Sequence, residues 1–259
     1  LGGNFLFTSR DYGATWTKSK DLTRSINRDN VVLMGVANRD TRISRNDGDA
    51  ISEISNFVES PLDPKVLWVG TDDGNVQVTQ DGGATWTELS AAIVATGKVK
   101  DGAFVGDIVA SSASKGTAYV SFDAHRDGDF KPYLFKTTDF GKTWKAIVNG
   151  LPGDDASIRG LTEFPGKPNV LFAGTERALF VTHDGGDHWN KLTANLPTTQ
   201  YADIVIHPKT KDLILSTHGR GIWILDDATP IADWTPAVAA EKAHLYNIPR
   251  ATLMRSEER

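Results

Sequence analysis

One short motif occurs four times along the chain and constrains the fold more than any other feature. Each copy has an aspartate, a glycine two residues later, and a tryptophan three residues after the glycine. The aspartates are Asp11, Asp81, Asp139 and Asp184, and the tryptophans are Trp16, Trp86, Trp144 and Trp189. The carboxylate can accept hydrogen bonds from N–H groups just downstream, and glycine adopts a positive φ without steric cost. We therefore expect the tip of a β-hairpin at each copy.

The residues on either side of each motif support this interpretation. A short apolar or aromatic run precedes each copy, as in residues 5–7 and 179–181, and a Thr-Trp or His-Trp pair opens the next strand. Catalysis or metal binding would be the functional interpretation of these aspartates. Because four equivalent copies cannot all be one active site, we interpret the aspartates and tryptophans as structural.

The motif resembles the Asp-box, or BNR repeat, of sialidases, xyloglucanases and the sortilin-type receptor domain. Those proteins are β-propellers, in which the Asp-box closes the hairpin between the outer two strands of a blade and does no chemistry. The resemblance implies an all-β chain: a β-propeller of four-stranded antiparallel blades with Asp-box hairpins. The same motif occurs in enzymes, receptors and assembly factors, so it does not by itself assign an activity.

The spacing of the motifs sets the expected blades. Successive aspartates are 70, 58 and 45 residues apart, and a blade of four short strands takes about 40–50 residues. We expect three full blades and two partial ones, over residues 5–17, 54–89, 105–147, 158–192 and 202–225. Residues 18–53 form a long polar insertion, which in a compact fold is typical of a functional or mobile loop.

The expected domain organisation has two parts. Residues 1–227 are the propeller segment, and residues 228–259 are a linker or tail that leads toward a following domain. Three full and two partial blades are too few for an ordinary closed ring, so we expect the remaining blades to come from missing sequence or another chain. The chain opens on Leu1 inside a strand–turn unit, and we interpret it as part of something longer, from which a signal peptide could be missing.

Composition narrows the classes of partner and cofactor. The net charge is −5 and the basic residues are scattered, which disfavours a nucleic-acid partner. Cysteine is absent, so disulfides and cysteine metal sites are excluded. No stretch approaches the roughly 20 apolar residues that a membrane span needs. We therefore expect no nucleic-acid partner, no cofactor and no membrane span.

Functional residues are expected at the end of the blades opposite the repeated turns. In an antiparallel blade, the turns that join strands two and three lie opposite those that join strands three and four. Propellers usually bind ligands on that face, by analogy at the level of the fold. The polar candidates for binding a polysaccharide or protein ligand there are Asp72, His125, Arg126, Asp127, Glu176, Arg177, His218 and Arg220.

A glycoside hydrolase would need two of the carboxylates on this face. The two groups lie roughly 5–10 Å apart, and one has a raised pKa. The candidates are Asp72 or Asp73 together with Asp123 or Asp127. We single out Asp73 and Asp123 as the catalytic pair. Pairing of the loop charges with one another or with solvent is the structural alternative.

Other kinds of site fit the sequence less well. A calcium site would use Asp123, Asp127 and Asp129, but Arg126 lies within this set and the full loop pattern is missing. His125 and His218 each have an arginine nearby that would repel a cation, so we expect no metal site.

A sialidase resemblance would require three convergent arginines with a tyrosine–glutamate pair. Arg126, Arg177 and Arg220 could supply the cluster, but no such pair is evident, since Tyr119 and Tyr133 lie in expected strands.

Four segments, residues 123–133, 173–176, 217–227 and 244–246, resemble one branch of the Asp-box proteins. They are similar to large bacterial secreted proteins with sortilin-like propellers, often labelled BNR glycosyl hydrolases. The resemblance implies an exported protein, extracellular or periplasmic. We expect a module that binds or scaffolds a glycan or protein through the face opposite the Asp-boxes. The alternative is a xyloglucanase-like glycoside hydrolase with a two-carboxylate mechanism on the same face.

Overall fold

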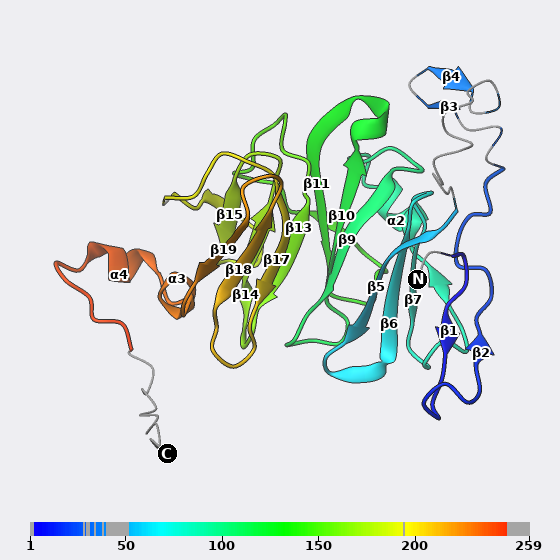
Figure 1. Cartoon of the computed structure of the whole chain (residues 1–259), viewed down its shortest axis with the longest axis horizontal. Helices are drawn as coiled ribbons and strands as arrows, with labels where there is room; N and C mark the ends of the chain where they lie inside the picture. Colours follow the sequence, from blue (N-terminus) through cyan, green and yellow to red (C-terminus); the bar gives the residue numbers. More distant parts are fainter. Residues whose placement is uncertain are drawn as a thin grey trace, which may run out of the picture.

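The described part of the chain is nearly all β, as the sequence predicts. The computed structural model describes residues 3–27, 29, 32, 33, 35–37, 39, 52–193 and 195–247. Its strands form antiparallel sheets that follow one another in chain order across the molecule (Figure 1). Residues 40–51 of the predicted insertion and residues 248–259 of the predicted tail lie outside the described residues.

Three four-stranded sheets form the middle of the molecule and are the expected blades two, three and four. Blade two consists of β5 (Ile54–Ser60), β6 (Asp63–Thr71), β7 (Val76–Thr79) and β8 (Thr87–Glu88). Blade three consists of β9 (Phe104–Ala110), β10 (Ala118–Ala124), β11 (Asp129–Thr137) and β12 (Lys145–Ala146). Blade four consists of β13 (Gly160–Phe164), β14 (Lys167–Gly174), β15 (Leu179–Thr182) and β16 (Asn190–Lys191). The prediction of three full blades is confirmed.

Smaller sheets lie at the two ends of this series (Figure 1). Blade one is the hairpin of β1 (Phe7–Thr8) and β2 (Thr17–Lys18), and blade five has β17 (Tyr201–Ile206), β18 (Leu213–Thr217) and β19 (Ile222–Leu225). The insertion contains the hairpin β3 (Val32–Leu33) and β4 (Val36–Ala37). Among the described residues, the helices are α2 (Ser90–Val94), the 3-10 turn η3 (His125–Asp127), α3 (Thr229–Ala232) and α4 (Pro236–Ala240). Within the described ranges, no helix is long and apolar enough to cross a membrane.

The core lies between neighbouring blades rather than at one centre. The second strands carry continuous apolar runs, such as residues 66–69 and 171–173, that are buried on both faces. Such runs are typical of strands covered from both sides. Each interface is one buried cluster with side chains from both blades. The first contains Trp68 and Val120, the second Tyr119 and Leu171, and the third Phe172 and Leu215. Adjacent residues of one strand therefore pack against opposite neighbours, which stacks the blades in an arc.

The first part of the insertion packs against blade two. Leu22 is fully buried, and its N–H donates to the Asn4 carbonyl at 2.9 Å. The Leu22 carbonyl accepts hydrogen bonds from the side-chain amides of Asn75 and Gln77, both at 2.8 Å. These bonds attach the start of the insertion to β7 and to the residue before it. The residues that follow Leu22 therefore lie at the end of the blades opposite the repeated turns. We call this end the rim.

Candidate functional site

Each of the four repeated turns closes a hairpin, which in blades two to four joins the third and fourth strands, and the first three turns share one hydrogen-bond pattern. In the turn of blade three, the Thr137 hydroxyl donates to Asp139 Oδ1 at 2.9 Å and accepts from the Gly141 N–H. The N–H and hydroxyl of Thr143 donate to the two carboxylate oxygens at 2.9 and 2.6 Å. The turns of blades one and two contain the same bonds. Each carboxylate is thus satisfied by its own turn.

These hydrogen bonds stabilise the ionised form of the turn aspartates. The pKa values of Asp11, Asp81 and Asp139 are lowered to about 2, first because a threonine hydroxyl donates to each carboxylate and next because a backbone N–H does. A carboxylate with a low pKa and occupied oxygens is a poor proton donor. This geometry supports the structural interpretation of the turns.

The fourth turn departs from the other three. His188 stands where the other three turns have threonine. Its N–H donates to Asp184 Oδ1 at 2.9 Å, but histidine has no hydroxyl to donate to the second carboxylate oxygen. In the first three turns the indole N–H donates to the turn glycine. Trp189 instead donates to the Ile147 carbonyl at 2.8 Å and is fully buried between blades three and four. Trp16, by contrast, is 61% exposed. The fourth tryptophan is therefore a core residue of the blade interface.

On the rim, a hollow of about 220 Å³ brings together five of the residues predicted from sequence. They are Asp72, Asp73, Asp123, Arg126 and Asp127. The hollow is also lined by Lys100, Asp101 and Phe104, and the Arg126 guanidinium lies 5.6 Å from the centre of the Phe104 ring. Loops of blades two and three and the link between them thus form one polar cavity with an aromatic wall.

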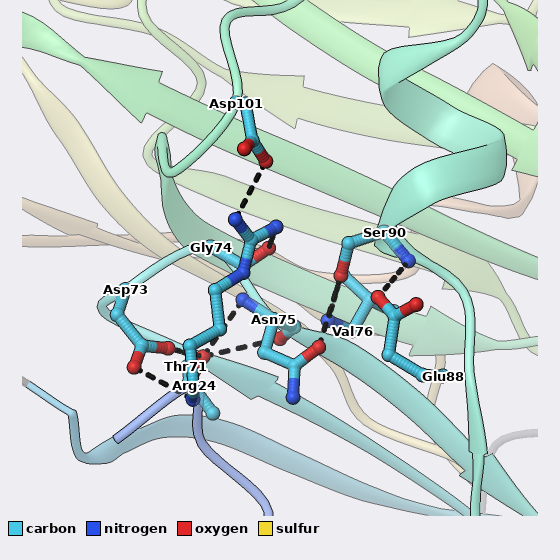
Figure 2. A network of polar contacts seen from close by, with 9 residues as sticks. All are labelled: Arg24, Thr71, Asp73, Gly74, Asn75, Val76, Glu88, Ser90 and Asp101. Carbon is cyan, nitrogen blue, oxygen red and sulfur yellow. Dashed lines mark hydrogen bonds and ion pairs between the residues drawn. The ribbon is translucent and has the colours of Figure 1, made fainter. Parts of the chain in front are cut away.

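Asp73 ties this hollow to the insertion (Figure 2). Its buried carboxylate accepts from the Thr71 hydroxyl at 2.5 Å and from the Arg24 N–H at 2.8 Å. The Arg24 guanidinium then donates to the Gly74 carbonyl at 3.0 Å and to Asp101 at 2.6 Å. Both oxygens of Asp73 are engaged, and the bonds hold Arg24 across the rim.

Asp72 lies in a different environment from its neighbour. It is half-buried, and one carboxylate oxygen accepts from the Glu53 N–H at 2.7 Å. The pKa of Asp72 is raised, first of all by burial. The hydrogen bond from the Glu53 N–H is the next largest effect and opposes the rise, the charge of Asp73 adds to it, and Arg126 opposes it more weakly. Asp72 therefore lies in the hollow, and its carboxyl group holds its proton more tightly than that of an ordinary aspartate.

Asp123 is the centre of a second polar chain. Its side chain is only 4% exposed, and Oδ2 lies 2.5 Å from both His125 Nδ1 and Arg159 Nη1. Arg159 Nε donates to Glu176 at 2.5 Å, which connects blades three and four. Asp123 Oδ1 also accepts from the His125 N–H at 3.0 Å. These contacts involve Nδ1 of the His125 ring and not Nε2. The His125 side chain is 42% exposed.

The sequence-based set does not include Arg159, although this residue joins two of its members. Arg159 lies just before β13, in the link between blades three and four. Links between blades run on the same face as the turns that join strands two and three. A charged residue just before the first strand of a blade is therefore the sequence signal by which Arg159 could have been predicted to lie on the rim. Arg24, Lys100 and Asp101 were also not predicted; the latter two lie in the link between blades two and three.

The remaining predicted residues lie elsewhere on the rim. Glu176 and Arg177 line a separate hollow of about 480 Å³, and Arg177 forms an ion pair with Asp155. His218 and Arg220 are exposed in the β18–β19 turn and line neither hollow. The rim residues thus form separate groups rather than one convergent cluster.

The carboxylates of the calcium alternative each have their own partner. Asp127 pairs with Lys100 at 2.9 Å, and Asp129 accepts from the Tyr133 hydroxyl at 2.6 Å. Asp123 is engaged by His125 and an arginine, as described above. Across the residues that the structure describes, no group of three His, Cys, Asp or Glu side chains is arranged to hold a metal ion.

Comparison with known proteins identifies the fold. No protein-family profile matches the sequence, and no curated protein sequence matches it. The GH74 xyloglucanase from Xanthomonas campestris is similar in structure, with a TM-score of 0.60 at 21% identity, over 88% of this chain and 34% of that one. The GH74 enzyme from Niastella koreensis has a TM-score of 0.51 at 17% identity, over 67% of this chain and 28% of that one. The chain spans about a third or less of these structures.

These structures are β-propellers, and the chain has the same fold. An ancestral GH74 enzyme is also similar, with a TM-score of 0.51 at 11% identity, over 64% of this chain and 22% of that one. At such identities the likeness concerns the arrangement of the strands. A shared fold does not assign an activity.

Proposed function

We propose that the rim binds a glycan and that the chain is part of a carbohydrate-binding propeller. The observation that carries the proposal is the hollow between blades two and three. Sugar hydroxyls both donate and accept hydrogen bonds, and this hollow presents acceptors on Asp72 and Asp127 beside donors on Lys100 and Arg126. Phe104 adds an apolar surface for the C–H face of a sugar ring. A few polar groups around an apolar wall are typical of small-molecule sites.

A second hollow extends the site beyond one sugar. It measures about 640 Å³ and is lined by Asn75, Glu88 and α2, among others. Asp101 lines both hollows. Its ion pair with Arg24 lies between Asp73, which lines the first hollow, and Glu88, which lines the second (Figure 2). The first hollow is smaller than the 300–1,000 Å³ that is typical of drug-sized ligands. An oligosaccharide that crosses the ion pair would fill both hollows, so we assign a chain of sugars as the ligand.

Calorimetric titration with xyloglucan and β-glucan oligosaccharides, after a glycan-array screen, tests the proposal. Asp72→Asn should weaken binding about tenfold or more, because it changes the hydrogen-bonding of a group in the hollow. Asp187→Asn is the matched control, since Asp187 is an exposed carboxylate paired with Lys145 at the turn end. The proposal fails if no glycan binds, or if both variants bind as the parent does. A protein ligand on the same rim is then the alternative.

Glycoside hydrolysis is the second candidate, and the raised pKa of Asp72 favours it. A general acid of this class needs such a carboxyl. Asp73 and Asp123 each have both oxygens engaged, so we assign the acid role to Asp72 and the partner role to Asp127, which lines the same hollow. Release of reducing sugar from xyloglucan, lost in Asp72→Asn and Asp127→Asn but retained in Asp187→Asn, would support the enzyme. Glycan binding without release would support the binding module.

We also propose that the protein is exported and that further blades complete the arc, from the same polypeptide or from another chain. The resemblance of four segments to secreted Asp-box proteins supports export, and the exposed aliphatic side chains of Val205, Ile222 and Ile224 on blade five support completion. Cell fractionation of the native protein tests the first part. Recovery of the protein in the cytosol alone would contradict it.

A further inference from the structure

A groove lies where the chain leaves blade five and packs on blade four. After β19 the chain forms α3 (Figure 1), and Ala228 and Ala232 are buried in the core cluster of blades four and five. A space of about 500 Å³ remains between residues 230–246 and the strands β15 and β16. We call this space the tail groove. Its volume is within the range that is typical of small-molecule sites.

Polar contacts fix the α3 wall of the tail groove to blade four. His183 Nε2 lies 2.7 Å from the Ile231 carbonyl oxygen, and because a carbonyl only accepts, Nε2 carries the hydrogen and donates this bond. Lys167 donates to the Ala232 carbonyl at 3.3 Å and forms an ion pair with Asp233. The wall is therefore in place before a ligand arrives, which lowers the entropic cost of binding.

Two aromatic side chains line the tail groove and are only partly covered. Trp234 is 40% exposed, and Tyr246 is half-buried. The Trp234 ring centre lies 5.3 Å from that of His183, with the two planes tilted by 49°. Leu192 adds aliphatic surface to the same groove. Aromatic rings bind one another by offset stacking or edge-to-face contact, so these walls suit a ligand with a planar aromatic body.

The charge of the tail groove is positive. Lys191 lines the groove, and among the described residues no aspartate or glutamate does, whereas five aspartates line the first hollow of the rim. Lys191 is exposed and makes no ion pair with any other described residue. Asn190 beside it adds an amide donor. An anionic group on a ligand would therefore meet a cation and a donor, with no carboxylate to repel it.

We propose that the tail groove binds an aromatic carboxylate. The ring lies against Trp234 and Tyr246, and the carboxylate pairs with the Lys191 ammonium group. A neutral sugar would leave Lys191 without a counter-charge. The residues that line the tail groove differ from those that line the three hollows of the rim. The inference therefore goes beyond the proposed glycan site and does not depend on it.

Titration of the whole chain with 2-naphthoate, followed by proton–nitrogen NMR, tests this inference. The Trp234 indole N–H and the backbone N–H groups of Lys191 and Tyr246 report on the groove. For a ligand of this size we expect a Kd of about 1 mM or tighter. Two matched ligands separate the contributions, because 2-naphthamide lacks the charge and cyclohexanecarboxylate lacks the aromatic ring. Each should bind at least about threefold more weakly than 2-naphthoate.

Two variants test the assigned residues. Lys191→Met removes the charge and keeps an unbranched side chain, so it should weaken 2-naphthoate about threefold to fivefold and leave 2-naphthamide unchanged. Trp234→Leu should weaken both ligands about tenfold. Lys142→Met and Trp16→Leu are the matched controls, since they change an exposed lysine and an exposed tryptophan in other turns, and both should bind as the parent does. Circular dichroism checks that each variant is folded.

The inference is overturned if 2-naphthoate shifts none of the groove signals, or if 2-naphthamide binds as tightly. Equal binding of 2-naphthoate by Lys191→Met and the parent overturns it as well. Displacement of 2-naphthoate by a neutral xyloglucan oligosaccharide would assign the groove to the glycan and would also overturn it. Weaker binding of 2-naphthoate by Lys191→Met at unchanged glycan affinity supports it, and shows that the groove and the rim are separate sites.

Discussion

The two ends of β7 carry the same local turn and use it differently. At one end the Thr71 hydroxyl donates to Asp73 at 2.5 Å and accepts from an N–H four residues along the chain. At the other end the Thr79 hydroxyl makes the equivalent bonds to Asp81 and to an N–H four residues on. The second oxygen of Asp81 is satisfied within its own turn by Thr85. The second oxygen of Asp73 is satisfied by a backbone N–H 49 residues away.

This difference separates a structural repeat from a site. A turn that satisfies its own aspartate can be repeated in every blade, because it needs nothing from the surroundings. A turn whose aspartate takes a partner from a distant segment can differ in each blade. The rim is built in the second way, and its loops combine into hollows that no single blade contains. The following predictions test this contrast, from the largest expected effect to the smallest.

Removing the cation that joins blades three and four should have the largest effect on stability. Arg159→Leu leaves the buried Asp123 carboxylate without its guanidinium partner, and an orphaned buried charge costs about 3–5 kcal/mol. Because Arg159 keeps partial exposure, we expect the lower end of this range. Urea denaturation measures the free energy of unfolding. The double variant with Asp123→Asn should recover part of the loss, and a loss below that of an ordinary surface substitution would contradict the prediction.

Truncating Asp73 should destabilise the protein more than truncating Asp81. Asp73→Ala removes hydrogen bonds to a buried carboxylate and should cost about 2 kcal/mol. Asp81→Ala removes bonds at an exposed turn and should cost less. Unfolding midpoints of the two variants provide the comparison. Equal losses would show that the distant partner adds nothing, and loss of glycan binding in Asp81→Ala at unchanged stability would show that the turn is functional.

The pH dependence of stability should separate locally satisfied aspartates from a buried one. The turn aspartates have a folded-state pKa of about 2, below the ordinary 3.8. Their contribution is present above about pH 4 and is lost as the pH falls toward 2. Asp107 on β9 has its pKa raised to about 6, first by burial. Its contribution is present below about pH 4 and is lost as the pH rises through 6.

Melting temperatures between pH 2 and 7 measure both effects. Asp107→Asn should flatten the profile between pH 4 and 6 and leave the acid limb unchanged. If the profile of this variant matches that of the parent, burial of Asp107 does not control stability in this range.

Relieving strain in the first turn should have the smallest effect, and it should be stabilising. Tyr12 has a φ of 56° and its side chain is fully exposed, whereas Gly82 and Gly185 occupy this position in two other turns. Left-handed backbone costs a residue with a Cβ about 1–2 kcal/mol, and glycine has an entropic penalty of about 0.5–1 kcal/mol. Tyr12→Gly should therefore raise the unfolding free energy by about 0.5 kcal/mol. Ala14→Gly, at a position without positive φ, should lower it.

Much of the fold was predictable because its determinants are local. The turn motif satisfies its aspartate within five residues, as Asp139 and Thr143 show. The apolar runs of the second strands indicate burial on both faces. These two patterns were enough to place the three full blades and the two partial ones. They also indicated which loops share the rim, because antiparallel strands fix the side on which each turn lies.

The partners within the rim were decided by the tertiary structure alone. Asp73 takes its second hydrogen bond from Arg24, and Asp123 and Glu176 share Arg159. Trp189 repeats a motif position but fills a blade interface instead of its own turn. Sequence spacing carries no information about these choices, because a charge or an indole takes the partner that blade stacking brings within reach. Local hydrogen bonding therefore determines the repeat, and the packing of one blade on the next determines the site.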